Sequence, residues 1–199
     1  MSLEVDGRTA RRNRNLDAVL DAVLELFTED SLEPGAADVA ERSGVSLRSV
    51  YRYFDDTEAL VRAAIARNLE QVQPLFEIDD LGEGPLEGRI ERIVDRRLAL
   101  YEETAPMTRA SLRRASGNDL IREQLDRNQR AMRVQVEQMF ATEVDGLAAA
   151  DRREVVAALD VLLGFPSIEH LRRTRRLSGR DARAVLRRAV TAVLASRRA

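Results

Sequence analysis

Two arginines and two tyrosines stand close together between residues 46 and 53, in a segment without any acidic side chain. A guanidinium can donate a pair of hydrogen bonds to the O6 and N7 atoms of guanine, which is worth about 1–3 kcal/mol of base discrimination. Serine and tyrosine hydroxyls suit phosphate oxygens. The alternative is a polar helix face without a partner. We predict contact with duplex DNA by Ser46, Leu47, Arg48, Ser49, Tyr51, Arg52 and Tyr53.

A second group of basic residues lies near the N-terminus. Arg8, Arg11, Arg12 and Arg14 occur within seven residues, and no acidic residue interrupts them. Such a group can contact phosphates or enter a minor groove, although a solvated basic terminus is the alternative. We assign Arg11 and Arg12 to the predicted DNA contact.

The composition excludes several kinds of chemistry. The 199 residues contain no cysteine and a single histidine, His170, which excludes disulfides, thiolate metal sites and clusters of histidine ligands. His170 directly follows Glu169, which does not fit the Glu-x-x-His spacing of di-metal helical bundles. Neither a glycine-rich phosphate loop nor a nucleophile elbow occurs. We therefore expect no enzyme, no cofactor and no metal, while catalysis by carboxylates alone stays open.

A short helix, a tight turn and a second short helix would position the side chains at 46–53. Residues 36–43 have helical apolar spacing, and Gly44 can take the left-handed conformation that ends a helix. Ser46 is a good N-cap for the next helix. Val50 and Phe54, four residues apart, can pack back on the first helix. This spacing predicts a helix-turn-helix, whose second helix can enter a major groove.

Helical periodicity continues through the rest of the chain. We expect Pro74 and Pro106 to end helices, and Gly164 and Pro166 to interrupt one. Glycines and prolines between residues 74 and 88 predict a loop. The predicted helices outside the helix-turn-helix cover about 11–29, 57–73, 86–104, 106–115, 118–144, 149–176 and 181–196.

These elements predict an all-α fold of about nine helices. An N-terminal three-helix helix-turn-helix domain would occupy residues 1–56, and a larger C-terminal helical bundle for ligand sensing and dimerisation would occupy residues 57–199. No stretch approaches the roughly 18 consecutive apolar residues of a membrane span, so we expect no membrane contact and a cytoplasmic location.

Residues 11–60 contain five stretches typical of one family of DNA-binding proteins: Leu-Asp-Ala-Val-Leu at 16–20, Leu-Glu-Leu-Phe at 24–27, Asp-Val-Ala-Glu-Arg-Ser-Gly-Val-Ser at 38–46, Val-Tyr-Arg-Tyr-Phe at 50–54 and Glu-Ala-Leu at 58–60. Through them, residues 11–60 resemble the DNA-binding domain of the TetR family of transcriptional regulators, and residues 171–190 resemble the closing helices of that family more weakly. The resemblance implies a homodimer that pairs through its last two helices, a small-molecule pocket in the C-terminal bundle, and double-stranded operator DNA bound by two recognition helices.

The sequence departs from the family pattern at three places that usually contact phosphate. Glu33, Pro34 and Gly35 stand where a threonine or serine usually begins the second helix. Ala37 replaces an arginine, and Thr57 replaces a lysine. We therefore predict weaker or more salt-sensitive DNA binding, unless the arginines at positions 8–14 compensate.

The C-terminal bundle supplies two further sets of predicted residues. Methionine and aromatic side chains at helical spacing favour a pocket for an apolar or amphipathic effector, with plain core packing as the alternative. The predicted pocket set is Tyr101, Met107, Leu112, Met132, Phe140 and Phe165. An apolar stripe in the last helices predicts a dimer interface of Leu163, His170, Leu186, Val190 and Val193.

Together these observations predict a sequence-specific DNA-binding transcriptional regulator, a repressor whose operator affinity changes with a small ligand. Two other classes stay open: a helical interaction protein that has lost DNA binding, and a helical-bundle enzyme that uses carboxylates alone.

Overall fold

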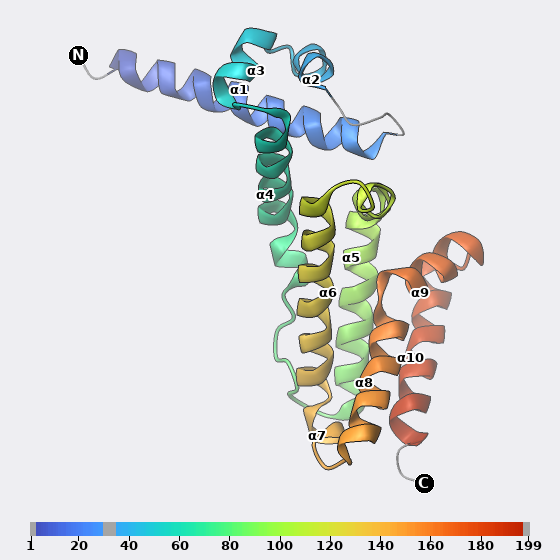
Figure 1. The fold of residues 1–199 in the computed structure, drawn as a ribbon. Helices are drawn as coiled ribbons and strands as arrows, with labels where there is room; N and C mark the ends of the chain where they lie inside the picture. The colour runs from blue at the N-terminus through green and yellow to red at the C-terminus, as the bar shows by residue number, and fades with distance from the viewer. Residues whose placement is uncertain (1–2, 30–34, 197–199) are drawn as a thin grey trace. The chain divides into compact units, whose positions relative to one another are not determined.

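The computed structural model describes residues 3–29 and 35–196, and this part of the chain is helical without any strand (Figure 1). The predicted all-α fold is therefore confirmed. The chain forms two compact units, of which the first comprises residues 1–72 and 106–122 and the second residues 73–105 and 123–199. The boundary predicted at residue 56 lies inside the first unit.

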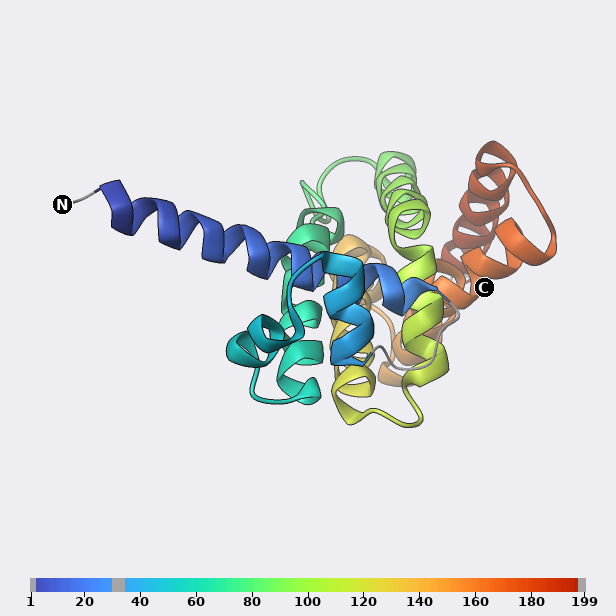
Figure 2. The same ribbon diagram turned by 90° about the horizontal axis from the view of Figure 1, so that it is seen from above.

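The first unit contains three helices before residue 54. These are α1 (Leu3–Thr28), α2 (Ala36–Ser43) and α3 (Leu47–Tyr53), followed by α4 (Thr57–Phe76), most of which belongs to the same unit. α2 packs against both α1 and α3. The first half of α1, which begins well before the predicted residue 11, extends beyond them (Figures 1 and 2). One apolar stripe of each helix joins a common core that includes Val19, Val23, Val39, Val50 and Leu60.

The second unit is a helical bundle in which α8 packs against α10 (Figure 1). Gly164 separates α8 from α9, as predicted, because its extended backbone interrupts the helix and Pro166 begins the next one. The core of the unit includes Ile93, Val136 and Phe140. Its helices are α5 (Leu86–Arg114, up to residue 105), α6 (Asp119–Met139, from residue 123), α7 (Ala141–Val144), α8 (Ala149–Leu163), α9 (Phe165–Glu169), a π-helix (His170–Thr174) and α10 (Gly179–Ser196).

Two prolines that were predicted to end helices lie inside them instead. Pro74 is within α4 and Pro106 is within α5. A proline removes one backbone donor and crowds the carbonyl four residues earlier, so it weakens a helix locally without always ending it. Both prolines lie at or near points where the chain passes from one unit to the other, after residue 72 and after residue 105.

Three residues predicted for the dimer interface are buried inside the protomer. Leu163, Leu186 and Val190 are at most 2% exposed and pack within the core of the second unit. They cannot form the contact predicted for them, because the packing of α8 against α10 already covers this apolar stripe. Val193 packs partly buried against the same core, whereas His170 is exposed.

Candidate nucleic-acid interface

The turn between α2 and α3 is set by two residues that the sequence identified. Gly44 ends α2 with a backbone φ of 67°, a left-handed conformation in which a Cβ atom causes strain. The hydroxyl oxygen of Ser46 then accepts a hydrogen bond from the backbone N–H of Ser49 at 3.3 Å. Ser46 is therefore the N-cap of α3, as predicted.

α3 buries one face and exposes another. Val50 is 1% exposed and packs with Phe54 in the core of the first unit. On the outer face lie Arg48, Arg52 and Tyr51, whose exposed fraction is 58%. The structure thus places the predicted DNA-contacting residues on α3 and its cap; Leu47 and Ser46 are exposed as well, while Ser49 and Tyr53 are partly buried.

Basic residues of α1 lie close enough to act on this part of α3. Arg52 donates a hydrogen bond to the Tyr53 hydroxyl at 3.4 Å, and its guanidinium carbon lies 5.3 Å from the centroid of that ring. This contact with Arg52 lowers the pKa of Tyr53, and Asn15 and Arg12 of α1 shift it in the same direction. Arg11 and Arg12 are exposed. Of the basic residues near the N-terminus, Arg12 is therefore within electrostatic reach of α3.

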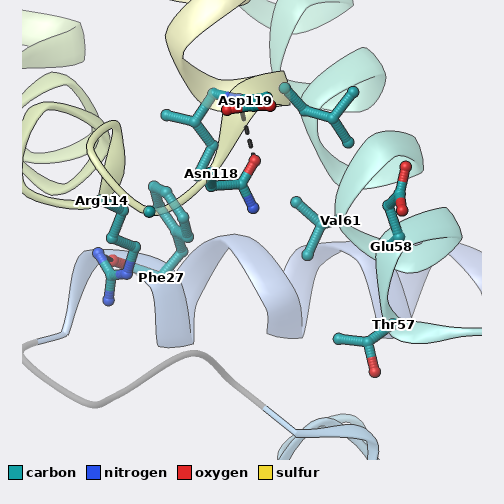
Figure 3. A pocket seen from close by; sticks show the side chains of 10 residues that line it. Phe27, Thr57, Glu58, Val61, Arg114, Asn118 and Asp119 are labelled. Carbon is teal, nitrogen blue, oxygen red and sulfur yellow. Dashed lines mark hydrogen bonds between the residues drawn. The ribbon is translucent and has the colours of Figure 1, made fainter.

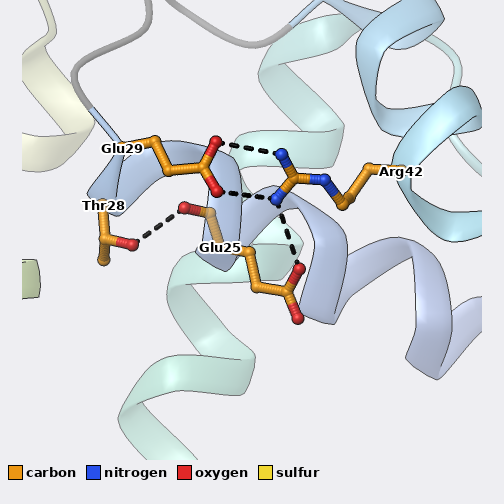
Figure 4. Close-up of polar contacts among 4 residues, drawn as sticks. All are labelled: Glu25, Thr28, Glu29 and Arg42. Atoms are coloured by element: carbon orange, nitrogen blue, oxygen red, sulfur yellow. Dashed lines mark hydrogen bonds and ion pairs between the residues drawn. The ribbon is translucent and has the colours of Figure 1, made fainter.

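Acidic residues of α1, and Glu29 directly after it, contact other helices. Arg42 of α2 forms two hydrogen bonds with Glu29, of 2.8 and 2.9 Å, and a third with Glu25 at 3.4 Å (Figure 4). These contacts raise the pKa of Arg42 and lower that of Glu29. Further along α1, Asp17 accepts a hydrogen bond from Arg67 of α4 at 2.9 Å. The negative charge of these carboxylates is thus partly neutralised by contacts with Arg42 and Arg67.

Of the three departures from the family pattern, the structure describes the two at Ala37 and Thr57 in full. Ala37 and Thr57 are exposed, and neither can supply a positive charge. Glu33 and Pro34 lie outside the described residues, as does the side chain of Arg8.

A cavity of about 530 Å³ in the first unit was not foreseen from the sequence (Figure 3). It lies between the end of α1, the start of α4 and the turn from α5 to α6. Arg114 of α5 donates a hydrogen bond to the Phe27 carbonyl at 2.9 Å, and its guanidinium carbon lies 4.3 Å from the centroid of the Phe27 ring. The Asn118 side chain caps α6 by accepting from the N–H of Ile121 at 3.2 Å. The contact of Arg114 with Phe27 fixes residues 106–122 to the end of α1, although the two stretches are distant in sequence.

The six residues predicted for an effector pocket do not form one group. Met107 and Leu112 belong to the first unit, and Leu112 is 51% exposed. The other four belong to the second unit, where Phe140 is completely buried in the core. Tyr101 and Phe165 are neighbours, with ring centroids 5.6 Å apart.

The described residues contain neither a cluster of metal ligands nor a membrane-spanning helix. No group of three or more histidine, aspartate and glutamate residues in this part of the chain could hold a metal ion. No helix within it has the length and apolar character that a bilayer crossing requires.

Comparison with known proteins agrees with this geometry. The family model of bacterial regulatory proteins of the tetR family matches residues 19–64. Two uncharacterized HTH-type transcriptional regulators, from two strains of Mycobacterium tuberculosis, are 38% identical to this chain over 69 residues. That match covers 34% of this chain and 34% of each relative, so the chain aligns with about a third of the length of these curated relatives.

Solved structures share the fold over nearly the whole chain. The crystal structure of a tetR-family transcriptional regulator from Streptomyces coelicolor has a TM-score of 0.70 at 23% identity, and the match covers 92% of this chain and 82% of that one. A TetR transcription regulator from Haloarcula marismortui has a TM-score of 0.63 at 14% identity, with 92% and 97% covered. At these identities the comparison shows the common fold.

Proposed function

Because the chain belongs to the TetR family of bacterial regulatory proteins, we propose that it is a transcriptional repressor that binds operator DNA as a homodimer. α3 of each protomer lies in a major groove, and a small effector bound in the second unit changes the affinity for DNA. Operator DNA is in the cytoplasm, which is therefore where the protein acts.

The outer face of α3 is the observation that carries this proposal. Arg48, Tyr51 and Arg52 are exposed there, and α3 contains no acidic residue. Arg48 and Arg52 are suited to guanine or phosphate, and the Tyr51 hydroxyl to a phosphate oxygen. Acidic residues of α1 are held by Arg42 and Arg67, which reduces their repulsion of DNA.

Titration of the protein with labelled DNA from upstream of its own gene, over a series of salt concentrations, tests this proposal. The binding constant should fall with salt, with a logarithmic slope of about −0.9 for each phosphate neutralised. Arg48→Ala should weaken specific binding by about 1–3 kcal/mol, or about 5- to 150-fold, because one base contact is lost.

The matched control is Arg130→Ala, which removes the same charge from an exposed position on α6 in the second unit and should leave the affinity within about twofold. Equal losses in both variants would show that only total charge matters. An absence of binding at low salt would favour the alternative of a helical interaction protein that has lost DNA binding.

The exposed faces of α8 and α10 support dimerisation through these two helices, but by other residues than the three predicted ones that are buried in the protomer. Val161 of α8 is 67% exposed and Val185 of α10 is 43% exposed, although both are large apolar residues. Ala157 and Ala192 on the same two helices are also exposed, and such small side chains allow close helix packing. A second copy of the chain would cover these faces, and binding to successive major grooves would require the two α3 helices to lie about 34–36 Å apart, one turn of DNA.

Substitution of Val161 by arginine tests the dimer. A charge at the centre of the paired helices would be desolvated without a partner, so Val161→Arg should give a monomer in light scattering after size exclusion, whereas the wild type is a dimer. Val134→Arg, at a position of α6 that is 46% exposed, is the control and should remain a dimer. A monomeric wild type would refute the dimer.

The effector changes DNA affinity only to the extent that it prefers one conformation of the protein, an effect typically worth 1–3 kcal/mol. Three helices, α4, α5 and α6, continue from one unit into the other and can transmit such a preference.

A further inference from the structure

Two arginines of α5 are buried in the second unit, and the first has a full set of partners. Arg89 is 4% exposed. Its Nη1 and Nη2 atoms donate to the two carboxylate oxygens of Glu143 at 2.6 and 2.5 Å, and it also donates to the carbonyls of Met139 at 2.7 Å and Gly84 at 3.1 Å. The contact with Glu143 raises the pKa of Arg89. This is a neutralised arginine with a structural role.

Arg97 is buried more deeply but has only neutral hydrogen-bond partners. It is 2% exposed. Its Nη1 donates to Oε1 of Gln135 at 2.8 Å, and its Nη2 donates to the carbonyl of Met132 at 3.0 Å. A guanidinium has five N–H donors, so these two bonds leave part of its capacity unused. Neither of these two hydrogen bonds is to a carboxylate.

The charges around Arg97 compensate it incompletely. Desolvation lowers the pKa of Arg97 to about 10, and the carboxylate of Asp160 on α8 opposes this effect only in part. Desolvation also raises the pKa of Asp160. Arg133 of α6 and Arg97 lower this pKa, whereas Glu137 raises it further. Asp160 therefore does not neutralise the charge of Arg97 in the way that the direct contact with Glu143 neutralises Arg89.

Apolar and aromatic residues lie on the same side of α5 as Arg97. Ile93 and Tyr101, one helical turn before and after Arg97 on α5, are both buried in the core. Tyr101 donates a hydrogen bond from its hydroxyl to Oε2 of Glu169 at 2.7 Å, and its ring adjoins Phe165. A charge in this setting disfavours folding of the free protein, and local exceptions of this kind are typical of functional sites.

We propose that Arg97 is the anion-recognising residue of the effector site, and that the effector is an amphipathic carboxylate. Its carboxylate pairs with the planar guanidinium, for which bidentate pairing is the preferred geometry. Its apolar body packs along Tyr101 and Phe165. This inference rests on the proposed function only in naming the ligand as the effector, because the binding site itself does not depend on DNA.

The first experiment compares the two buried arginines in the ligand-free, full-length protein. Arg97→Met should leave the thermal midpoint unchanged or raise it, since an uncompensated charge is replaced by an apolar side chain of similar length. Arg89→Met should lower the midpoint, since Glu143 is left buried without a partner. A lower midpoint for Arg97→Met would assign Arg97 a structural role and overturn the proposal.

The second experiment measures binding by calorimetry with two carboxylate probes, octanoate and 3-phenylpropanoate, and the alcohol that matches each. At least one carboxylate should bind the wild type and bind Arg97→Met roughly tenfold more weakly or worse, as expected for loss of a charge-assisted hydrogen bond. The alcohols should show no such difference. Equal carboxylate affinity in the two proteins, or no carboxylate binding to the wild type, overturns the proposal.

The bound carboxylate is then added to the DNA titration. A change in operator affinity in the wild type, absent in Arg97→Met, supports its role as effector. Binding through Arg97 without any change in DNA affinity would preserve the site and refute the effector role. Failure to bind DNA at all would refute the proposed function and leave the calorimetric result intact.

Discussion

The paired hydrogen bonds between Arg42 and Glu29 join α2 to the residue that directly follows α1. Both side chains reach solvent, so the contact holds through charge and geometry more than through burial. The ionisation of Glu29 therefore controls how well α2 is held.

Glu29→Gln should show this as a dependence on pH. Arg42 holds the pKa of Glu29 below its ordinary value of 4.5 in the folded protein. The resulting stability is present above that value and is lost as the pH falls through the lowered folded-state pKa. The gap in thermal midpoint between the wild type and this variant should therefore be larger at pH 7 than at pH 3.

Glu154→Gln, which changes an exposed glutamate of α8, provides the control and should give the same small gap at both pH values. If the gap for Glu29→Gln were also the same at pH 7 and pH 3, the ion pair would contribute no pH-dependent stability.

Single residues differ in how far the sequence predicts their role. Ser46 and Val50 could be assigned because a cap and an i, i+4 contact are local. The sequence does indicate that Arg97 is unusual, because its charge lies between the buried positions 93 and 101 on one face of a helix. Nothing in the sequence shows that Glu143 pairs with Arg89 and not with Arg97. That distinction depends on contacts between distant helices.

Among the helices, α2 and α3 show how strongly short-range signals set an element. Their observed bounds agree with the predicted ones because Gly44 and Ser46 specify the end of one helix and the start of the next. The ends of α4 and α5 were predicted less well. Pro74 and Pro106 are unfavourable locally, yet both helices continue, and packing of neighbours such as Ala105 and Ala110 in buried positions outweighs that local preference.

Gly44→Ala should lower the free energy of unfolding by about 1–2 kcal/mol, because the left-handed backbone at this position is unfavourable for a residue with a Cβ atom. Urea unfolding of the full chain measures this loss. Gly44→Asn should be milder, since asparagine tolerates this conformation better.

Gly146→Ala is the matched change, as this glycine is outside the left-handed region and has open space where the Cβ atom would be. A loss for Gly44→Ala no greater than that for Gly146→Ala would mean that the turn does not require glycine.

Across the whole molecule, two of the boundaries between the units lie close to prolines, whereas none lies at residue 56, where the sequence predicted a domain boundary. The chain passes between units after residues 72, 105 and 122, and the first two points lie next to Pro74 and Pro106. Sequence periodicity could not show this, because it records one helix at a time and contains no information on which distant segments share a core. The contact of Arg114 with Phe27 is of that long-range kind.

Pro106→Ala should strengthen α5 where it passes between the units. The new N–H group can donate to the carbonyl of Glu102, and the free energy of unfolding should rise by about 1–3 kcal/mol. Hydrogen exchange of the backbone around residues 102–107 should slow, and the response of DNA affinity to a bound effector should weaken as the helix becomes stiffer.

Pro85→Ala is the control. This proline precedes α5, so the N–H group that alanine would introduce has no carbonyl of that helix to which it could donate. Unchanged exchange around residues 102–107 in Pro106→Ala would show that Pro106 is not a weak point.

Because α5 and α6 return residues 106–122 to the first unit, the DNA-reading module of this protein is not a continuous piece of its gene. A single truncation of the chain cannot yield the complete first unit. A fusion of residues 1–72 to another ligand-binding domain would lack Arg114 and the turn that supports the end of α1. Exchange of modules by recombination therefore requires the recipient protein to supply its own equivalent of that turn, which links the evolution of the helix-turn-helix to that of α5 and α6.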